Sequence, residues 1–293
     1  MIDVSIIIVN YNSAEYTRCI VDSIKQKTHG IEYEIVVVDN ASNEQDIDYL
    51  KKHVDAKIIE NEKNLGFGRA NNIGIKNSAG RNILFLNPDT KLVNNAIKIL
   101  SDFLDNNTNV GACGGNLYHE DMSEQLSFWR LLPGAKLELN ALFSDIFIHL
   151  KYGKSYQFNN TEKPINVGHI VGADLMIPRK IIDRIGYFDK DFFLFYEETE
   201  LCYRLHKLGL GVVSVPQAKI IHYESQSIGT KLQRLNYMMP SRKLYLEKCV
   251  SKKEKFLADT ILRINCCLRL VAFTFLFKKD KKIYWRKVLK NIE

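Results

Sequence analysis

The first hundred residues alternate between short apolar runs and segments with apolar side chains at helical spacing. Val4–Val9 is a run of mostly β-branched residues, which is typical of a strand buried on both faces. Ser13 can cap a helix that continues to about Gln26, and Ser42 with Gln45 fits a capping box for a second helix. The further strands expected are Glu34–Asp39, Lys57–Glu60 and Arg81–Asn87, and the further helices are Phe67–Asn77 and Asn95–Asp105. This alternation predicts an α/β fold with a parallel sheet covered by helices.

The second half of the chain is less regular. Residues 119–165 carry no clear period, which predicts a long loop region. A regular apolar pattern returns at Val167–Ile177. From Lys231 to the end, the pattern predicts helices, and the segment is basic. The elements expected between them are helices at Arg179–Ile185 and Glu197–Leu208, the second stopped by Gly209, and strands at Gly211–Val215 and Lys219–His222.

Composition excludes several classes of protein. Of the 293 residues 46% are hydrophobic, with 14 Tyr and 15 Phe, so the chain is not intrinsically disordered. The six cysteines are too few for a disulfide scaffold, and no Cys-x-x-Cys pair signals a zinc site or a thioredoxin-like motif. The first ten residues read as a buried strand and not as a secretory signal, which predicts a cytoplasmic location.

The net charge of +7 is distributed unevenly. Residues 230–293 hold 17 lysines and arginines against 5 acidic residues, a net of +12, whereas residues 1–229 carry a net of −5. A nucleic-acid partner is therefore not indicated. Ile264–Phe277 is an apolar stretch of 14 residues flanked by lysines. It is shorter than the ~20 residues of a membrane span. It predicts either a helix lying in an anionic membrane surface, or one packed on the domain or on a second subunit.

Polar clusters follow three of the expected strands. They are Asn10-Tyr11-Asn12, Asp39-Asn40-Ala41-Ser42 and Asn87-Pro88-Asp89. Each cluster alone has a local explanation as a helix cap or a turn. Because ligands of parallel α/β sheets bind outside the carboxyl ends of the strands, three such clusters favour a single binding crevice.

A segment rich in glycine and asparagine, Asn61–Gly74, follows the third strand. Gly66 and Gly68 permit the close approach of a backbone, and the helix N-terminus behind them can face an anion. A tight loop explains these glycines but not the polar residues around them, which are Asn64, Arg69, Asn71 and Asn72. The segment is a weak match to a dinucleotide-binding fingerprint, which belongs after the first strand.

Four further residues carry candidate chemistry. Asp89 suits a hard divalent cation, although an Asp after proline also forms turns. His222 is a lone histidine at a strand end and joins a metal site only if its strand reaches the same crevice. Glu197 and Glu198 follow the largely aromatic residues 192–196 at a helix start. The helix dipole explains acids there, but desolvation would also raise a carboxylate pKa and prepare a general base.

These segments together resemble glycosyltransferase family 2, the inverting enzymes with the GT-A nucleotide-diphospho-sugar fold. The matching segments occur in family order over about residues 3–228, and they are Val-Ser-Ile-Ile-Ile-Val-Asn-Tyr-Asn, Val-Val-Asp-Asn-Ala-Ser, Asn-Leu-Gly-Phe-Gly-Arg-Ala-Asn-Asn-Ile-Gly, Leu-Asn-Pro-Asp-Thr, Val-Gly-Ala-Asp-Leu-Met-Ile, Phe-Tyr-Glu-Glu-Thr-Glu-Leu-Cys-Tyr-Arg and His-Tyr-Glu-Ser-Gln-Ser. The Asn-Pro-Asp variant looks most like the rhamnosyltransferase branch. The resemblance implies a GT-A domain at 1–229, with a nucleotide-binding half at 1–115 and an acceptor-binding half at 116–229, before a basic helical region at 230–293.

The resemblance also implies roles for individual residues. Asp39 would read the nucleobase, Asp89 would hold Mg²⁺ or Mn²⁺ on the diphosphate, and His222 would complete the metal shell. Glu198 stands at the position of the family's base, with Glu197 as a competitor because a Glu replaces the usual Asp at 198. The other residues expected at the substrate are Asn10, Tyr11, Asn12, Asn40, Asn64, Gly66, Arg69, Asn72, Asn87 and Asp174. Asn87 replaces the first carboxylate of the family's Asp-x-Asp, which predicts weak metal binding.

The expected reaction is a single in-line displacement. It would move a sugar, with rhamnose a candidate, from a dTDP- or UDP-sugar to a hydroxyl of a glycan or lipid-linked acceptor in bacterial surface polysaccharide assembly. The enzyme would work in the cytoplasm at the inner face of the cell membrane. The partners expected besides the substrates are an anionic membrane surface and a second copy of the chain in a homodimer. The alternatives are a silent nucleotide-sugar-binding protein and a sugar-phosphate nucleotidyltransferase. The second would need a glycine-rich loop directly after the first strand, where Asn-Tyr-Asn-Ser stands.

Overall fold

A nine-stranded mixed sheet forms the centre of the structure, a computed structural model that describes residues 1–224 and 230–292. Its order is β3-β2-β1-β4-β10-β6-β11-β5, with β8 paired to β11. Among these described strands six run in one direction, and β5, β8 and β10 run against them. The strands are β1 (Val4–Asn10), β2 (Tyr33–Asp39), β3 (Lys57–Glu60), β4 (Asn82–Leu86), β5 (Thr90–Leu92), β6 (Val110–Tyr118), β8 (Ile165–Asn166), β10 (Asp174–Pro178) and β11 (Gly211–His222). The expected α/β fold with a mixed, mostly parallel sheet is confirmed.

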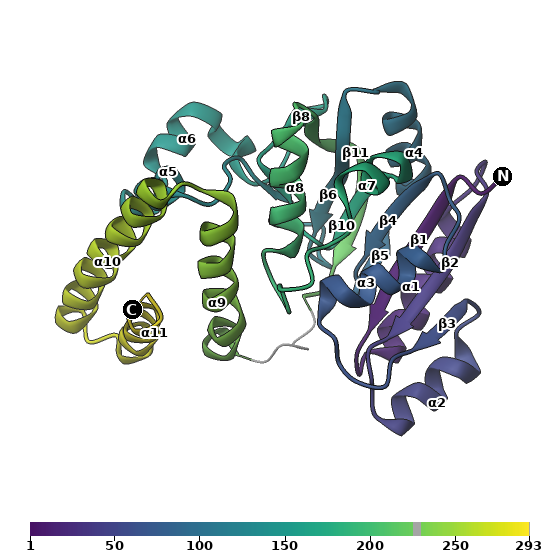
Figure 1. Ribbon diagram of the computed structural model, residues 1–293, viewed down its shortest axis with the longest axis horizontal. Helices are drawn as coiled ribbons and strands as arrows, with labels where there is room; N and C mark the ends of the chain where they lie inside the picture. The colour runs from purple at the N-terminus through teal and green to yellow at the C-terminus, as the bar shows by residue number, and fades with distance from the viewer. Residues whose placement is uncertain (225–229, 293) are drawn as a thin grey trace.

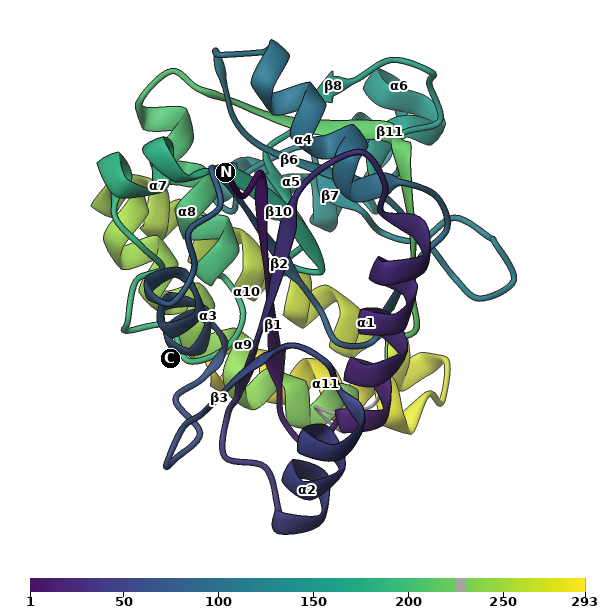
Figure 2. The same cartoon turned by 90° about the vertical axis from the view of Figure 1, so that its right-hand side faces the viewer.

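Helices cover both faces of this sheet (Figures 1 and 2). One face carries α1 (Ala14–Lys27) and α4 (Ala96–Asn106), with α2 (Glu44–His53) packed on α1. The other face carries α3 (Phe67–Lys76), α7 (Arg179–Ile185) and α8 (Glu197–Lys207). Two hydrophobic cores result, one on each side of the strands.

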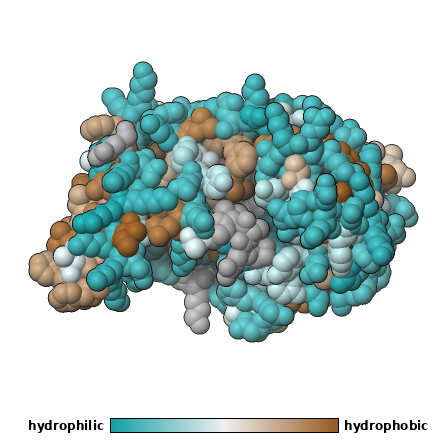
Figure 3. Space-filling model, turned by 90° about the horizontal axis from the view of Figure 1, so that it is seen from below, coloured by the Kyte–Doolittle hydropathy of each residue, from teal (hydrophilic) through white to brown (hydrophobic). Residues whose placement is uncertain are grey.

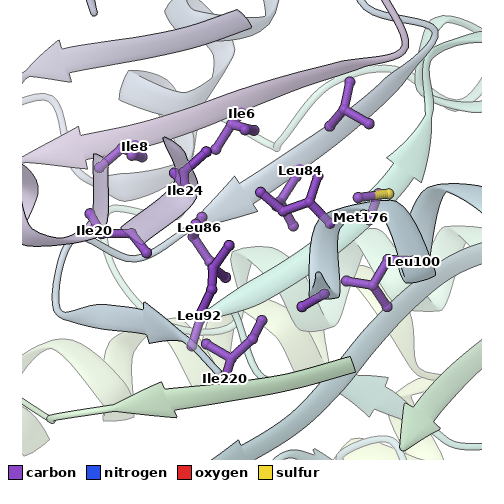
Figure 4. Close-up of a cluster of buried hydrophobic side chains, with 14 of the residues drawn as sticks. Ile6, Ile8, Ile20, Ile24, Leu84, Leu86, Leu92, Leu100, Met176 and Ile220 are labelled. Carbon is purple, nitrogen blue, oxygen red and sulfur yellow. The ribbon is translucent and has the colours of Figure 1, made fainter. Parts of the chain in front are cut away.

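The apolar run of β1 is continuous because its side chains feed both cores. Ile6 and Ile8 pack on the α1 side with Ile20 and Leu84, as Figure 4 shows. Ile7 points to the opposite face and packs in the core below α3 and α8. Because side chains of a strand alternate between faces, a central strand covered on both sides needs apolar residues at every position.

Three strands of the sheet have no counterpart in the sequence analysis, and they are β6, β5 and the two-residue β8. β6 contains Gly114 and Gly115, and a Cβ at these positions would lie 2.5 Å from Ile170 Cγ2 and 2.6 Å from the Ala218 carbonyl oxygen. Crowding by neighbouring chain therefore selects glycine here, and this hides the usual strand pattern. β5 has only three residues. The two strands expected at Gly211–Val215 and Lys219–His222 are one strand, β11, with an irregular register between Ser214 and Lys219.

The long loop expected at 119–165 contains regular elements, so that expectation is wrong. They are β7 (Phe128–Trp129), which pairs with β9 (His169–Ile170), the helices α5 (Ala135–Leu142) and α6 (Ile146–Tyr152), and a 3-10 turn at Gly153–Tyr156. The helix α5 is short and its N-terminus is satisfied from outside, since Glu254 Oε1 accepts a hydrogen bond from Ala135 N at 2.8 Å. Tertiary contact, and not local pattern, stabilises this segment.

The two helix starts predicted in the first fifty residues are correct in place but not in chemistry. Ser13 occupies the N-cap of α1 without capping it, and Asp46 Oδ1 accepts the hydrogen bond of Ala14 N at 2.9 Å instead. The cap of α2 is Asn43, and not Ser42 as in the expected capping box. Ser42 instead donates to Asp39 Oδ1 at 2.6 Å, because the strand end and not the helix uses its hydroxyl.

The C-terminal region forms three helices, of which α9 lies beside α8 while α10 and α11 lie beyond it (Figure 1). They are α9 (Lys231–Cys249), α10 (Lys252–Phe275) and α11 (Lys279–Lys290). The helical extension of the fold is thus as expected, whereas residues 225–229, which hold the expected domain boundary and the end of the His-Tyr-Glu-Ser-Gln-Ser segment, lie outside the described residues. In the part of the chain that is described, no helix is long and apolar enough to cross a membrane.

A buried ionic cluster joins these helices to α5. Arg242 on α9 has a side chain only 8% exposed, and it lies 2.8 Å from both Glu138 on α5 and Asp259 on α10. The residues around it form an apolar cluster that includes Tyr245, Leu246 and Ala258. Removing the cation would leave two shielded carboxylates without their shared partner.

We therefore expect Arg242→Leu to lower the free energy of unfolding by about 3 kcal/mol, measured by urea denaturation. Lys243→Gln is the matched control, since Lys243 is the next residue on the same helix but is exposed. Equal stability of Arg242→Leu and the control would show that the cluster contributes nothing.

Candidate active site

A cavity of about 700 Å³ opens at the carboxyl ends of the central strands. Nine of the residues expected at the site line it, and they are Tyr11, Asn40, Asn64, Gly66, Asn87, Asp89, Glu197, Glu198 and His222. Six others are not among the lining residues, and they are Asn10, Asn12, Asp39, Arg69, Asn72 and Asp174. The strand-end clusters therefore converge on one crevice, but several of their members support it from behind.

The ends of β1 and β2 are held together by a buried network. Asn10 Nδ2 donates to Asp39 Oδ1 and to Asp46 Oδ2, each at 2.8 Å. Ser42 N donates to Asp39 Oδ2 at 3.0 Å, so both carboxylate oxygens of Asp39 accept internal hydrogen bonds. Asn12 is exposed and accepts from Asn43 N. These residues fix the strand ends, and the role of Asp39 toward a nucleobase stays a prediction.

Asn40 and Asn64 form the wall beside this network. Asn40 Nδ2 donates to Asn64 Oδ1 at 2.9 Å, and Asn40 Oδ1 accepts from Leu65 N at 3.0 Å. Asn64 Oδ1 also accepts from Gly66 N at 2.9 Å. These bonds order the loop between β3 and α3 and present two amide side chains to the cavity.

Gly66 is required by a contact within the protein. Its φ is +84°, and a Cβ there would lie 2.2 Å from the Phe193 carbonyl oxygen. The same oxygen accepts a hydrogen bond from Phe67 N at 2.9 Å. The close approach that the sequence predicted at Gly66 is therefore made by the loop before α8, and the first amide of α3 is engaged by that loop.

Arg69 and Asn72 reinforce the same junction. Arg69 Nε donates to the Lys190 carbonyl at 2.6 Å, and Asn72 exchanges hydrogen bonds with the backbone of Phe188 at 2.8 and 3.0 Å. Both side chains thus fasten α3 to residues 188–190. Asp174 lies fully buried below the cavity, where burial raises its pKa and Gly115 N donates to its carboxyl group.

Asp89 and His222 meet through the short strand β5. Thr90 pairs with His222, and Tyr223 N donates to the Asp89 carbonyl oxygen at 2.9 Å. The pairing brings Asp89 Oδ1 to 3.5 Å from His222 Nε2, and both side chains remain at the cavity surface. β11 therefore delivers His222 to the crevice of Asp89, which was the condition for a joint role.

This pair fits a divalent cation that takes most of its ligands elsewhere. One carboxylate and one imidazole are suitable ligands for Mn²⁺, and the carboxylate also suits Mg²⁺. Among the described residues no group of three or more His, Cys, Asp or Glu side chains is arranged to hold a metal. A cation here would need further ligands from diphosphate and water, which agrees with the replacement of a carboxylate by Asn87.

Glu197 and Glu198 start α8 after a strained loop. Phe195 and Tyr196 both adopt left-handed backbone conformations, with φ of +68° and +69°. Glu197 is 3% exposed, and its Oε2 has no hydrogen-bond partner among the described residues. Glu198 is half-buried, and its side chain lies toward Gly172 at the cavity wall. Such backbone strain is held in place by the surrounding contacts.

Burial gives both carboxyl groups raised pKa values. For Glu197 burial is the main cause, and the neighbouring charge of Glu198 raises the pKa further. Burial also raises the pKa of Glu198, partly opposed by hydrogen bonds from its own amide and from Thr199. Burial therefore disfavours the charged form of both acids, most strongly at Glu197.

Four lining residues come from the first turns of α9 and were missed by sequence reasoning. They are Gln233, Arg234, Asn236 and Tyr237. Tyr237 stacks on Phe193, with ring centroids 5.7 Å apart. The sequence of this segment carries no motif that indicates a binding site. The residues reach the cavity because α9 packs against α8.

The sequence profile described as Glycosyl transferase family 2 matches residues 5–186, which is more than half of the chain. The chain belongs to glycosyltransferase family 2. The resemblance that the ordered segments suggested is confirmed, and with it the enzyme class of glycosyltransferase.

Several curated relatives are named as transferases of hexose or rhamnose. The low-salt glycan biosynthesis hexosyltransferase Agl10 of Haloferax volcanii is 28% identical, over 75% of this chain and 67% of its own length. The dTDP-rhamnosyl transferase RfbF of Shigella flexneri is 27% identical, over 64% of this chain and 59% of its own. The N-acetylglucosaminyl-diphospho-decaprenol L-rhamnosyltransferase of Mycobacterium tuberculosis is 24% identical, over 61% of this chain and 62% of its own length. The matched part of this chain thus spans about two thirds or less of the length of each of these relatives.

Solved structures confirm the GT-A fold. GalNAc-T7, solved with UDP, GalNAc and Mn²⁺, superposes with a TM-score of 0.64 over 89% of this chain and 51% of its own, at 17% identity. S. aureus TarS superposes with a TM-score of 0.55 over 99% of this chain and 48% of its own, at 16% identity. At these identities the likeness concerns the fold alone.

The contact at Gly66 leads to a prediction with an internal control. Gly209 has a similar φ of +73° but open space around it, so Gly209→Ala tests backbone strain alone. We expect Gly209→Ala to cost about 1–2 kcal/mol of unfolding free energy, and Gly66→Ala about 3 kcal/mol or more, because the new methyl also displaces Phe193. Chemical denaturation measures both, and equal losses would contradict the contact.

The raised pKa of Glu197 leads to a second prediction. The folded state holds this proton more tightly than the unfolded chain, so its stabilising contribution is present below the unfolded pKa of about 4.3 and is lost as pH rises through the folded pKa. Glu197→Gln does not ionise, so we expect its melting temperature relative to wild type to rise from pH 5 to pH 8. Glu62→Gln, at an exposed position, is the control. A difference independent of pH would refute this account.

Proposed function

We propose that the chain transfers a sugar with inversion, in one displacement at the anomeric carbon. The acceptor hydroxyl oxygen forms the new bond to that carbon while the bond to the diphosphate oxygen breaks. The proton of the hydroxyl passes to a carboxylate, and the nucleoside diphosphate leaves with the electron pair. The observation that carries this proposal is one cavity lined by both the Glu197–Glu198 pair and the Asp89–His222 pair.

Glu198 is the better candidate for the base. Its side chain is half-buried and lies along the cavity wall at Gly172, where an acceptor hydroxyl has access. Glu197 is nearly inaccessible, and its Cβ packs near Gly68 of α3. A general base must reach the proton it removes, so accessibility favours Glu198, and a raised pKa makes its carboxylate a stronger proton acceptor.

The donor is proposed to be a dTDP- or UDP-sugar held between β1, β2 and α3. A relative is named a dTDP-rhamnosyl transferase, and a structural neighbour was solved with UDP and Mn²⁺. Asp89 and His222 would hold Mg²⁺ or Mn²⁺, which when bound neutralises charge on the diphosphate. Asn40, Asn64 and Tyr11 line the same cavity and are proposed to contact the nucleoside.

The proposed acceptor is a glycan or a lipid-linked glycan. One relative is named for a diphospho-decaprenol acceptor, and another for glycan biosynthesis. The rhamnose assignment rests on two relatives named rhamnosyltransferases. The chain would act in the cytoplasm, where nucleotide sugars and the cytoplasmic face of lipid carriers meet.

The base assignment is tested by two isosteric variants. We expect Glu198→Gln to lower the rate of transfer by about 10²–10⁴-fold, because the proton acceptor is lost, while the affinity for dTDP or UDP stays near that of wild type. Glu197→Gln is the adjacent control and should retain most of the activity. Transfer rates and nucleotide affinities measured on both variants decide the assignment, and the reverse ranking would assign the base to Glu197.

We further propose that the end of α10 docks on an anionic membrane. Phe275, Leu276 and Phe277 are 78%, 59% and 90% exposed, and two exposed lysines, Lys278 and Lys279, follow directly. Figure 3 shows brown apolar side chains gathered at the end of the molecule that α10 and α11 form. Apolar groups beside lysines match the lipid and phosphate layers of such a surface.

Point variants test this docking, because α9 lines the cavity and the C-terminal helices are not removable without damage to the site. We expect the double variant Lys278→Gln/Lys279→Gln to bind vesicles of phosphatidylglycerol and phosphatidylcholine about tenfold more weakly than wild type at low salt. Leu150→Ser, at an exposed apolar residue of α6, is the control. Unchanged vesicle binding of the lysine variant, with loss of a dimer instead, would favour a second subunit as the partner.

A further inference from the structure

The charges around the cavity are unbalanced. Four carboxylate residues line it, and they are Asp89, Glu197, Glu198 and Glu224. Arg234 is the single lysine or arginine among the lining residues of the described chain. A nucleotide-sugar diphosphate is itself anionic, and breaking its bond to the sugar adds a further negative charge. A cavity lined by so many acidic residues needs cationic groups to bind an anionic diphosphate. Among the lining residues of the described chain, Arg234 is the side chain that supplies a permanent positive charge.

Arg234 has a half-buried side chain, and the fold shields its Nε without using it. Its Nε is removed from solvent and has no hydrogen-bond partner among the described residues. A buried donor left unpaired costs about 1–3 kcal/mol, which a ligand oxygen would recover. Arginine presents its donors as a planar fork that matches the oxygens of phosphate groups. An unpaired Nε on an arginine that lines the cavity is therefore a donor suited to an anionic ligand.

The first turn of α9 holds Arg234 rigidly. Thr230 and Gln233 form a capping box, in which Gln233 Oε1 accepts from Thr230 N at 2.7 Å and Thr230 Oγ1 accepts from Gln233 N at 3.4 Å. Leu235, the next residue, is fully buried among α10 and α11 side chains. Lys287 Nζ donates to the Leu232 carbonyl at 2.7 Å. Arg234 thus stands on a supported helix, with the capping box already engaging the amide of Gln233.

We propose that Arg234 binds the diphosphate group of a substrate in this cavity. The inference rests on the proposed function and deepens it, because it assigns an anion-binding residue on a segment outside the family-matched residues 5–186. Two substrates carry this chemistry, the nucleotide-sugar donor and an isoprenyl-diphosphate-linked acceptor. Arg234 is a ligand-binding residue in either case, and the two sources are separable by their soluble fragments.

Calorimetric titration of the full chain separates them. The probes are dTDP and UDP, each with and without Mn²⁺, and farnesyl diphosphate for the acceptor. The variants are Arg234→Gln, Arg234→Lys, which keeps the charge but loses the fork, and Lys231→Gln. Lys231 is the matched control, since it is an exposed cation one turn earlier on α9. Thermal melts establish that each variant folds.

We expect Arg234→Gln to weaken the affinity for a diphosphate probe by about tenfold to a hundredfold. Arg234→Lys should lie between, and Lys231→Gln should match wild type. Loss confined to dTDP and UDP assigns the donor, and loss confined to farnesyl diphosphate assigns the acceptor. Equal binding of all probes by wild type and both Arg234 variants overturns the inference and leaves the proposed function standing. Wild type that binds neither dTDP nor UDP would instead refute the proposed donor.

Discussion

The hydrogen bond from Phe67 N to the Phe193 carbonyl oxygen is the contact on which the site depends. It joins the helix α3, which packs on β1 and β2, to the loop that precedes α8. The approach is close enough that Gly66 has no room for a side chain. Arg69 and Asn72 tie the same helix to residues 188–190. The loop is thereby fixed in a left-handed conformation at Phe195 and Tyr196, which sets the start of α8 and the direction of its two glutamates.

The C-terminal helices complete this arrangement from the opposite side. Ser241 Oγ donates to the Leu194 carbonyl oxygen at 2.8 Å, and Tyr237 stacks on Phe193. The loop before α8 is therefore clamped between α3 and α9. The basic region is packed into the structure and is not a separate tail, because its first turns line the cavity and its buried Arg242 joins α5, α9 and α10. The +12 net charge of residues 230–293 thus combines a site residue and a buried cluster with the exposed lysines proposed to meet a membrane.

Sequence alone predicted the strands β1 to β4, because burial on both faces leaves long apolar runs such as that of β1. It also predicted the convergence of Tyr11, Asn40 and Asp89, since carboxyl ends of parallel strands meet at one edge. The Glu197–Glu198 pair was assigned to the same site only through the family resemblance. Sequence alone missed β6, where crowding selects glycine, and α5, where Glu254 supplies the cap from a distant helix. Arg234 was missed for the same reason, because only tertiary packing carries α9 to the cavity. Gly66 was singled out correctly, but for a ligand and not for the carbonyl of Phe193.

We propose that the nucleotide-binding wall, the glutamate pair and α9 enclose one active site. A crystal structure of the full chain with dTDP and Mn²⁺ would test this arrangement. We expect the nucleotide to lie in the cavity, with its diphosphate reaching the Asp89–His222 pair and Glu198 left free to face an acceptor. A nucleotide bound outside this cavity, or a diphosphate seated against Glu198 itself, would contradict it.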